Sequence, residues 1–354
     1  MPNENAALNA AARAKKDEFY TQIEDIEKEL RWYRHHFAGK TVLCNCDDPF
    51  ESDFFRWFVL NFDLLALKKS IATSYASGAR GRATKAYRAI VTSVREAEGH
   101  SADALDMAEL FRRPGNELLE LAGDGDFRSP ECLALLDEAD VVVTNPPFSL
   151  FRKYVATLME RDKKFIIIGN VNAITYKEIF PLIMDGQMWL GPSIHSGDRA
   201  FWVPDDYPLD ASGCGVDPKT GRRSIRVKGV RWFTNLDHGR RHEPMILVAR
   251  YSPDAYPKYD NYDAIEVSRT KDIPCDYPGI MGVPITFLDK YCPEQFEILG
   301  ITDRQDTSRL RTKKYTVADS PRYNDMNARS VLKTDEGYRQ VYARILIRNR
   351  RPTT

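Results

Sequence analysis

The octet Val-Val-Val-Thr-Asn-Pro-Pro-Phe, at residues 141–148, holds the side chains of this chain that are best suited to chemistry. A β-branched apolar run, typical of a buried strand, leads directly into Asn145, Pro146, Pro147 and Phe148. Two successive prolines fix φ and donate no N–H, so the carbonyl groups beside them stay free and rigidly oriented. An Asn side-chain oxygen and a neighbouring Pro carbonyl can both accept hydrogen bonds from one planar amino group, and Phe148 adds an aromatic face for stacking. The pattern suits N-methylation of a flat heterocyclic base.

An ordinary strand-ending turn with a proline pair and a core phenylalanine is the alternative, so the rest of the chain has to decide. The chain has 354 residues, 29% charged and 43% apolar, which is enough for one large domain with an accessory region. No apolar run reaches the length of a membrane span, and the first residues lack the hydrophobic segment of a signal peptide. We therefore expect a cytoplasmic protein without a membrane partner. The oligomeric state stays open, and a monomer is compatible with the sequence.

The six cysteines show no metal-binding pattern, because none forms a C-x-x-C pair or has a histidine at ligand spacing. We expect free thiols and no metal site. The cysteines are Cys44, Cys46, Cys132, Cys214, Cys275 and Cys292.

Positive charge is gathered in two segments, although the formal net charge of the chain is zero. Neither the stretch between Asp63 and Glu96 nor that between Asp217 and Asp237 contains an acidic residue. The first holds Lys68, Lys69, Arg80, Arg82, Lys85, Arg88 and Arg95, and the second Lys219, Arg222, Arg223, Arg226, Lys228 and Arg231. Such segments indicate one positive face that suits phosphate groups, the alternative being two solvated loops.

Strand and helix patterns alternate along the first half of the chain. Apolar runs predict strands at 41–46, 70–75, 87–93, 139–144 and 165–169. Helical spacing predicts helices at 17–37, 52–60 and 130–138, the second opened by Ser52. Ser149 is expected to cap a further helix that has Tyr154 on its apolar face, and Thr175 and Glu178 have capping-box spacing at the start of another. This alternation is the signature of an α/β fold with a parallel sheet and crossover helices.

Polar side chains follow several of these predicted strands. Asp47 and Asp48 come after the first strand, Asp126 lies in a polar turn, and Asn145 follows the strand at 139–144. Ligands of parallel sheets bind beyond the carboxyl ends of the strands. We therefore expect these side chains to converge on one crevice.

The alternation fades after residue 191. Residues 192–229 are rich in glycine, proline and basic side chains, and 252–280 is expected to be loop. Between them, 229–235 and 245–251 are expected to form an antiparallel strand pair. A further strand is expected at 341–347, ahead of a basic tail.

Four short blocks in this order resemble the EcoRI-type adenine-specific DNA methyltransferase family. They are the segment at 17–21, the strand and turn at 42–50, the acidic block at 123–127 and the tetrad at 145–148. The resemblance implies S-adenosylmethionine (SAM) as cofactor. The cofactor-binding residues that it implies are Phe19, Tyr20, Thr21, Asn45, Asp47, Asp48, Pro49, Asp124, Asp126 and Phe127.

The resemblance also implies a fold and a division of the chain. The expected fold is a Rossmann-like methyltransferase sheet with helices on both faces, followed by a loop-rich α+β region. Residues 1–38 would form a helical cofactor lid, 39–251 the catalytic domain, and 252–354 a region that recognises the DNA target. The expected substrate is a flipped adenine in duplex DNA, in a restriction–modification or epigenetic setting.

One block departs from the pattern of many methyltransferases, which carry a glycine-rich loop after the first strand. Here residues 48–54 contain no glycine, so the backbone cannot approach the ligand as closely. The methionine end of SAM would then be held by side chains such as Asp47 or Asp48.

DNA contacts are expected from the second acid-free segment, in particular from Arg222, Arg223, Lys228 and Arg231. The sequence does not separate base contacts from phosphate contacts. Two other functions stay open: N-methylation of an RNA base or a glutamine amide, and a catalytically silent DNA-binding relative.

Overall fold

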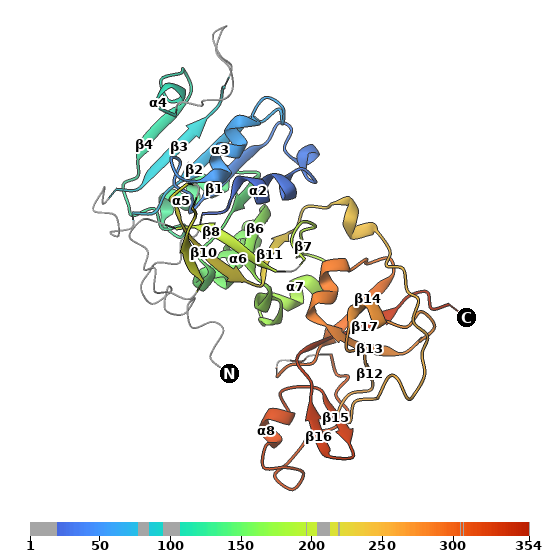
Figure 1. Ribbon diagram of the computed structural model, residues 1–354. Helices are drawn as coiled ribbons and strands as arrows, with labels where there is room; N and C mark the ends of the chain where they lie inside the picture. The colour runs from blue at the N-terminus through green and yellow to red at the C-terminus, as the bar shows by residue number, and fades with distance from the viewer. Residues whose placement is uncertain are drawn as a thin grey trace. The chain divides into compact units, whose positions relative to one another are not determined.

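The computed structural model describes residues 20–76, 85–94, 107–195, 197–203, 213–218, 220–304, 306 and 308–353. The chain divides into two compact units (Figure 1). Unit 1 consists of Met1–Val171 and Leu190–Asp237, and unit 2 of Asn172–Trp189 and His238–Thr354.

Within the described residues, the main sheet of unit 1 has eight strands in the order β4-β3-β2-β1-β5-β6-β11-β7. The strands are β1 (Thr41–Asn45), β2 (Lys69–Thr73), β3 (Tyr87–Val91), β4 (Glu117–Glu120), β5 (Val141–Thr144), β6 (Lys164–Asn170), β7 (Trp189–Leu190) and β11 (Val230–Thr234). β1 and β5 are buried along their whole length, as strands covered on both faces are.

The sheet is mixed, and the expectation of a parallel sheet is only partly confirmed. β1 pairs in parallel with β2 and β5, and β5 with β6. β3 runs antiparallel to β2, and β11 runs antiparallel to β6. β4 is antiparallel to β3 and so points the same way as β1. An apolar run shows that a strand is buried but does not record its direction.

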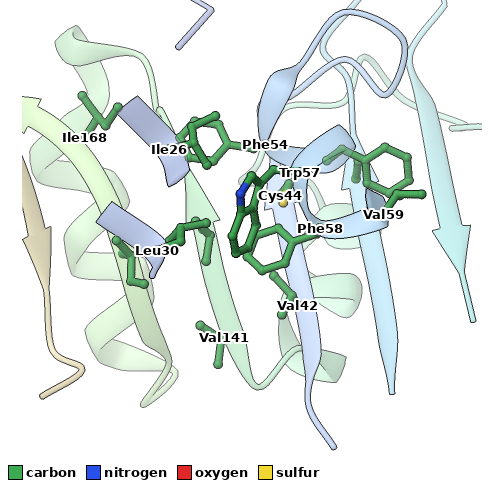
Figure 2. Close-up of a cluster of buried hydrophobic side chains, with 14 of the residues drawn as sticks. Ile26, Leu30, Val42, Cys44, Phe54, Trp57, Phe58, Val59, Val141 and Ile168 are labelled. Carbon is green, nitrogen blue, oxygen red and sulfur yellow. The ribbon is translucent and has the colours of Figure 1, made fainter. Parts of the chain in front are cut away.

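The α-helices of unit 1 cover a large apolar core. They are α2 (Ile23–Leu30), α3 (Asp53–Leu60), α4 (Met107–Leu110), α5 (Pro130–Glu138) and α6 (Phe151–Glu160), with 3₁₀ turns η1 (Arg34–His36), η2 (Phe148–Leu150) and η3 (Val171–Thr175), the last reaching into unit 2. Side chains of α2 and α3 pack on Val42 and Cys44 of β1 (Figure 2). Ser52 caps α3 by accepting the Phe54 N–H at 3.2 Å, so this helix start was predicted correctly.

Two predicted helix starts are wrong. α6 begins at Phe151 and its N-cap is Leu150, because η2 intervenes and the Leu150 N–H donates to the Pro147 carbonyl at 2.9 Å. Ser149 is therefore not the N-cap residue of α6. Thr175 donates to the carbonyl of Asn172 at 2.9 Å, and the next helix starts five residues later, so the capping box with Glu178 does not form.

A small sheet in unit 1 lies within residues 192–229, where the sequence predicted no strand before 229. Its strands are β8 (Asp198–Trp202), β9 (Cys214–Val216) and β10 (Arg223–Lys228), in the order β8-β10-β9. The expected pairing of 229–235 with 245–251 is wrong, since β11 pairs with β6 and 245–251 contributes only an isolated bridge at Ala249.

The described part of unit 2 contains a four-stranded sheet, β12-β13-β17-β14, and the hairpin β15-β16. Its elements are α7 (Phe180–Met184), η4 (Gly239–His242), β12 (Ile265–Glu266), η5 (Thr270–Asp272), β13 (Ile280–Pro284), η6 (Ile285–Lys290), β14 (Phe296–Ile301), α8 (Tyr323–Met326), β15 (Val331–Thr334), β16 (Gly337–Gln340) and β17 (Arg344–Asn349). Among the described residues, no helix has the length and apolar character needed to cross a membrane.

Candidate active site

The carboxyl ends of β1, β2, β4 and β5 meet at one edge of the main sheet, which we call the carboxyl edge. β1 and β5 are direct neighbours, with Val42 opposite Val141 and Leu43 opposite Val142. The turns that follow these strands therefore start side by side, one at Asn45 and the other after Thr144. Asp47 and Asn145 therefore follow the ends of two neighbouring strands at this edge.

The Thr144 hydroxyl joins the two turns. It lies 2.9 Å from Asp47 Oδ2 and also contacts the Asn45 carbonyl, and its single proton can serve only one of them at a time. The other oxygen of Asp47 accepts from the Ser52 hydroxyl at 2.9 Å. Asp47 is 5% exposed, so both carboxylate oxygens of a nearly buried side chain are held in place. The start of the tetrad is thus locked to the turn after β1.

Tyr154 of α6 ties a third part of the chain to this edge. Its hydroxyl donates to the Asn45 side-chain oxygen, and its ring stands edge-on to Phe127, with the ring centroids 5.0 Å apart. Burial raises the pKa of Tyr154 well above its ordinary value, so the phenol stays protonated and keeps donating. The helix after the tetrad therefore positions residues from two other turns.

The acidic block after β4 is anchored to the turn after β2. The Ala76 N–H donates to the Asp124 carbonyl at 2.8 Å, and the Asp126 N–H donates to the Asp124 carboxylate at 3.0 Å. Gly125 has φ +79°, and a Cβ there would lie 2.0 Å from the Ser74 carbonyl oxygen. Glycine is the residue that fits here, because it adopts a positive φ readily and has no Cβ to clash with the neighbouring backbone.

Electrostatics favour an ionised carboxylate in this block. Arg128 donates to both oxygens of Asp126, at 2.8 and 2.5 Å, and this contact lowers the pKa of Asp126 below its ordinary value. Asp126 is half-buried, Asp124 is exposed and Phe127 is buried. The block offers negative charge beside an apolar ring.

The tetrad itself lies partly open. Asn145, Pro147 and Phe148 are half-buried and Pro146 is buried, and Phe148 packs against the core cluster of unit 1. The Pro147 carbonyl accepts the Leu150 N–H at 2.9 Å.

The residues of the first two blocks have different surroundings. Tyr20 and Trp202 exchange two backbone hydrogen bonds of 2.9 Å, so the chain after the first block runs beside β8, and Thr21 is buried. Phe19 lies outside the described residues. After β1, Pro49 is buried and the half-buried Asp48 accepts the Phe50 N–H at 2.9 Å. The glycine-free turn is thus stabilised by its own side chains.

The predicted DNA contacts separate into exposed and buried positions. Lys228 and Arg222 are exposed, with the Arg222 guanidinium 4.9 Å from the Trp202 ring centroid, and Arg223 is half-buried. Arg231 is only 4% exposed, and its guanidinium donates to the carbonyls of Val230 and His195. β11 is buried along its whole length, which buries Arg231 with it, and the structure therefore removes Arg231 from the candidate DNA contacts.

The first acid-free segment is not a uniform positive face. Lys69 pairs with Glu138, and Lys85 pairs with Glu120 at 2.6 Å. Both carboxylates come from elsewhere in the chain. Arg80, Arg82 and Arg95 lie outside the described residues.

Sequence reasoning missed three residues that organise the carboxyl edge. Ser52 was assigned only a capping role, Tyr154 only a core position, and Thr144 no role. A weak signal was present for Thr144, because it is the one hydroxyl in an otherwise apolar strand directly before the tetrad. Nothing in the sequence pairs Tyr154 with Asn45, which lies 109 residues earlier.

The family described as "Adenine-specific methyltransferase EcoRI" matches residues 7–350 of this chain. The chain is 47% identical to "Type II methyltransferase M.EcoRI" of Escherichia coli over 316 residues, which cover 86% of this chain and 92% of that protein. It is 37% identical to "Type II methyltransferase M.MpnI" of Mycoplasma pneumoniae over 297 residues, covering 82% and 84%.

"Type II methyltransferase M.MgeORF184P" of Mycoplasma genitalium is likewise 37% identical, over 299 residues that cover 82% of this chain and 85% of that protein. No solved structure gives a significant match. A family match over nearly the whole chain and three long alignments agree with the four blocks found in the sequence. The chain belongs to the EcoRI family of adenine-specific methyltransferases.

Proposed function

We propose that this protein transfers the methyl group of SAM to N6 of a specific adenine in duplex DNA, in a restriction–modification setting. Its relatives are Type II methyltransferases. The observation that carries the proposal is the Thr144 hydroxyl, 2.9 Å from Asp47, which joins the turn holding Asn145 to the turn after β1. A methyl donor at one turn and an acceptor amine at the other would then be held at a fixed separation.

The residues at the carboxyl edge fit SAM. The ligand carries a sulfonium and an ammonium group, and the edge offers the carboxylates of Asp47, Asp48, Asp124 and Asp126. The Gly125 position, where a Cβ would clash with the chain, brings the backbone of the acidic block close to the turn after β2. We assign Tyr20 and Thr21, with Phe19 and Pro49, to the same binding site, and Asn45 and Phe127 to its walls.

In the proposed mechanism Asn145 and Pro146 activate the amine. The N6 lone pair of adenine is delocalised into the ring, which makes it a poor nucleophile. Hydrogen bonds from N6–H to the Asn145 side-chain oxygen and the Pro146 carbonyl favour a tetrahedral nitrogen with a localised lone pair. The same acceptors stabilise the positive charge that develops on nitrogen, an electrostatic effect that is in place before reaction. Bound SAM supplies the electrophilic methyl group.

The adenine has to leave the duplex to reach this edge, which costs a few kcal/mol. Stacking on Phe148 offsets part of that cost, by about 1–3 kcal/mol. Proton loss from the methylated nitrogen needs no histidine at neutral pH, because a protonated N-methyl aniline-type nitrogen is strongly acidic. Asn145, Pro146, Pro147 and Phe148 are thus sufficient for the catalytic turn that we propose.

The remaining assignments complete the proposal. Arg222, Arg223 and Lys228 contact DNA, and the main sheet is the Rossmann-like sheet of SAM-dependent methyltransferases, in a cytoplasmic enzyme. Residues 1–38 act as cofactor lid, 39–251 as catalytic domain and 252–354 as the target-recognition region. The boundary between the compact units differs in part, since two segments of the proposed catalytic domain, 172–189 and 238–251, belong to unit 2.

Methylation-aware sequencing of host DNA, with and without this gene, tests the proposal. We expect N6-methyladenine at one short sequence in cells that carry the wild-type gene and none with the Asn145→Ala variant. The variant should still bind SAM in calorimetry, since Asn145 is assigned to the substrate amine. Wild-type turnover by Asn145→Ala would refute the role of Asn145, and label from SAM appearing only in RNA or protein would refute DNA as substrate.

A further inference from the structure

The C-terminal part of unit 2 carries a strong positive charge that the mechanism above does not use. Residues 304–351 contain thirteen lysine and arginine residues but only five aspartate and glutamate residues, in a chain whose net charge is zero. Charge concentrated in this way attracts a polyanion without making the whole protein basic.

An exposed aromatic ring and an arginine lie together here. Tyr342, between β16 and β17, is 62% exposed. The guanidinium of Arg329 lies 4.6 Å from the centroid of its ring. A single exposed tyrosine needs no explanation, but a tyrosine stacked with an arginine presents a flat cationic platform.

The backbone beneath this platform is fixed. The Arg329 carbonyl accepts from the Asn261 side chain at 2.8 Å, and the Val341 N–H donates to the Ser330 carbonyl at 2.9 Å. The Arg344 guanidinium donates to the buried Glu266 carboxylate at 2.7 Å and to the Tyr342 carbonyl at 3.5 Å.

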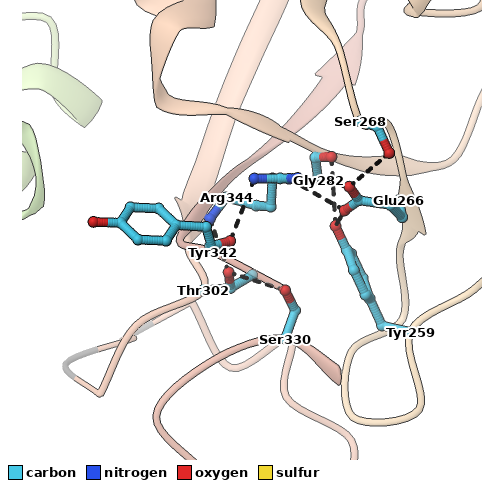
Figure 3. A network of polar contacts seen from close by, with 8 residues as sticks. All are labelled: Tyr259, Glu266, Ser268, Gly282, Thr302, Ser330, Tyr342 and Arg344. Atoms are coloured by element: carbon cyan, nitrogen blue, oxygen red, sulfur yellow. Dashed lines mark hydrogen bonds and ion pairs between the residues drawn. The ribbon is translucent and has the colours of Figure 1, made fainter. Parts of the chain in front are cut away.

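Figure 3 shows the Tyr342 ring pointing away from this polar network. The side chain is therefore displayed outward by a rigid frame, which is the arrangement that a binding surface requires.

A cavity of about 500 Å³ adjoins the platform. Its polar lining consists of Asp303, Arg304, Asp325, Arg329, Gln340 and the hydroxyl-bearing Tyr342. Arg304 and Asp325 lie 3.7 Å apart, with both side chains well exposed. A surface that only binds phosphates would be lined by cations, whereas this one mixes donors and acceptors around an aromatic face. Base edges, which present both donors and acceptors, match that mixture.

We propose that Arg329, Gln340 and Tyr342 read bases of the DNA target, and that the surrounding cations hold its phosphates. Arginine pairs with guanine and glutamine with adenine through two hydrogen bonds each, and Tyr342 supports the arginine by stacking. This inference rests on the proposed function, because it assumes a DNA target sequence. It makes these three residues determinants of specificity rather than of catalysis.

The test compares duplexes once sequencing has identified the methylated site. For wild type, Arg329→Ala, Gln340→Ala and Tyr342→Ala, kcat/KM is measured on a duplex with that site and on duplexes with one base pair changed. In the Arg329→Ala and Gln340→Ala variants we expect kcat/KM on the target duplex to fall by roughly 5- to 150-fold. Each variant should also discriminate less between the target and the duplex changed at one particular base pair. Tyr342→Phe should restore most of the activity lost in Tyr342→Ala, because it keeps the ring.

Arg348→Ala is the matched control, since it removes a positive charge from the same segment. The Arg348 side chain is 47% exposed and lies 3.6 Å from Glu297. The Arg348→Ala variant should leave the discrimination between duplexes unchanged. SAM binding, measured by calorimetry, should be the same in all variants.

The outcomes separate the two proposals. A wild-type protein that methylates no DNA overturns the proposed function. A wild-type protein that methylates DNA, with discrimination unchanged in Arg329→Ala and Gln340→Ala, overturns the inference. A lower salt dependence of binding with unchanged discrimination also overturns it, because it would make these residues phosphate contacts. The exposed Gln340→Ala variant keeps the test valid if Tyr342→Ala fails to fold.

Discussion

Unit 1 and unit 2 present their polar side chains in opposite ways. At the carboxyl edge of unit 1 the side chains are buried and hydrogen-bonded in pairs, Thr144 to Asp47 and Tyr154 to Asn45. At the cavity of unit 2 the ring of Tyr342 is 62% exposed, and the hydrogen bonds that fix its frame lie in the backbone and in the side chains of Asn261 and Arg344. The first region holds its functional groups through side chains, and the second displays them from a fixed frame.

This difference matches two different tasks. Methyl transfer from one cofactor to one kind of amine needs the same geometry whatever the DNA sequence, and a buried network preserves it. Reading a sequence needs side chains that can be exchanged without disturbing the fold, and exposed residues on a rigid backbone allow that. Substitutions should therefore spread their effects through unit 1 but stay local in unit 2.

The largest effect is expected from Gly125→Ala. The new Cβ would meet the Ser74 carbonyl oxygen at 2.0 Å, and alanine disfavours the φ of +79°. We expect affinity for SAM, measured by calorimetry, to fall by about 100-fold or more, equivalent to roughly 3 kcal/mol. Gly123→Ala is the control, because its Cβ would have no neighbour within 4 Å. Equal affinities in the two variants would contradict the anchored acidic block.

Thr144→Val should have the next largest effect. Valine keeps the shape but removes the hydroxyl that holds Asp47, which leaves a buried carboxylate oxygen short of a donor. Losing such a donor costs about 1–3 kcal/mol, so kcat/KM for SAM should fall by roughly 5- to 150-fold. Thr41→Val, at the other end of β1 and equally buried, should change little. Normal kinetics in Thr144→Val would show that the two turns do not depend on each other.

A smaller effect is expected from Arg222→Gln combined with Arg223→Gln. Removing two positive charges from the small sheet should weaken DNA binding several-fold at moderate salt and lower the slope of log K against log salt by up to about 1.8. Fluorescence anisotropy with a labelled duplex measures both. Neutralising the exposed Arg112 and Lys153 together is the charge-matched control. An unchanged slope would remove the β10 segment from the DNA interface.

Glu29→Gln should alter stability with little effect on activity. Glu29 is fully buried, accepts from the Tyr33 hydroxyl and the Ser193 N–H at 2.9 Å each, and has its pKa raised by burial to about 7. The folded state therefore binds an extra proton between about pH 4.5 and 7, and wild-type stability declines as pH rises through this window.

The decline should approach the order of 3 kcal/mol and be absent in Glu29→Gln. Urea unfolding at pH 5 and pH 8 measures it. Glu24→Gln, at an exposed position of the same helix, should keep the wild-type pH dependence. A pH dependence that survives in Glu29→Gln would assign it to another group.

Much of the local structure was readable from the sequence. The helix at 130–138, the cap at Ser52 and the strands around residues 42 and 142 were predicted within one or two residues, because apolar spacing and capping chemistry are local signals. The four blocks were also local, and their order was enough to point to the family that the comparisons then showed.

The misplaced helix starts are local errors, whereas the other errors concern relations between distant segments. Ser149 has the chemistry of a cap, but a 3₁₀ turn after the prolines delays the helix by two residues. Residues 245–251 have the composition of a strand, but the strand that pairs with β11 is β6. Arg231 lies in a basic segment, but it belongs to β11, which is buried along its whole length in the main sheet.

By itself, the sequence determined which residues are apolar, where the chain turns and which side chains carry the chemistry of the tetrad. Only the tertiary structure decided the direction of β3 and β11, the burial of Arg231 and the union of Thr144 with Asp47. The physical reason is that propensity and periodicity act over a few residues. Pairing of strands and bonding of buried side chains depend on which segments, up to a hundred residues apart, meet when the core closes.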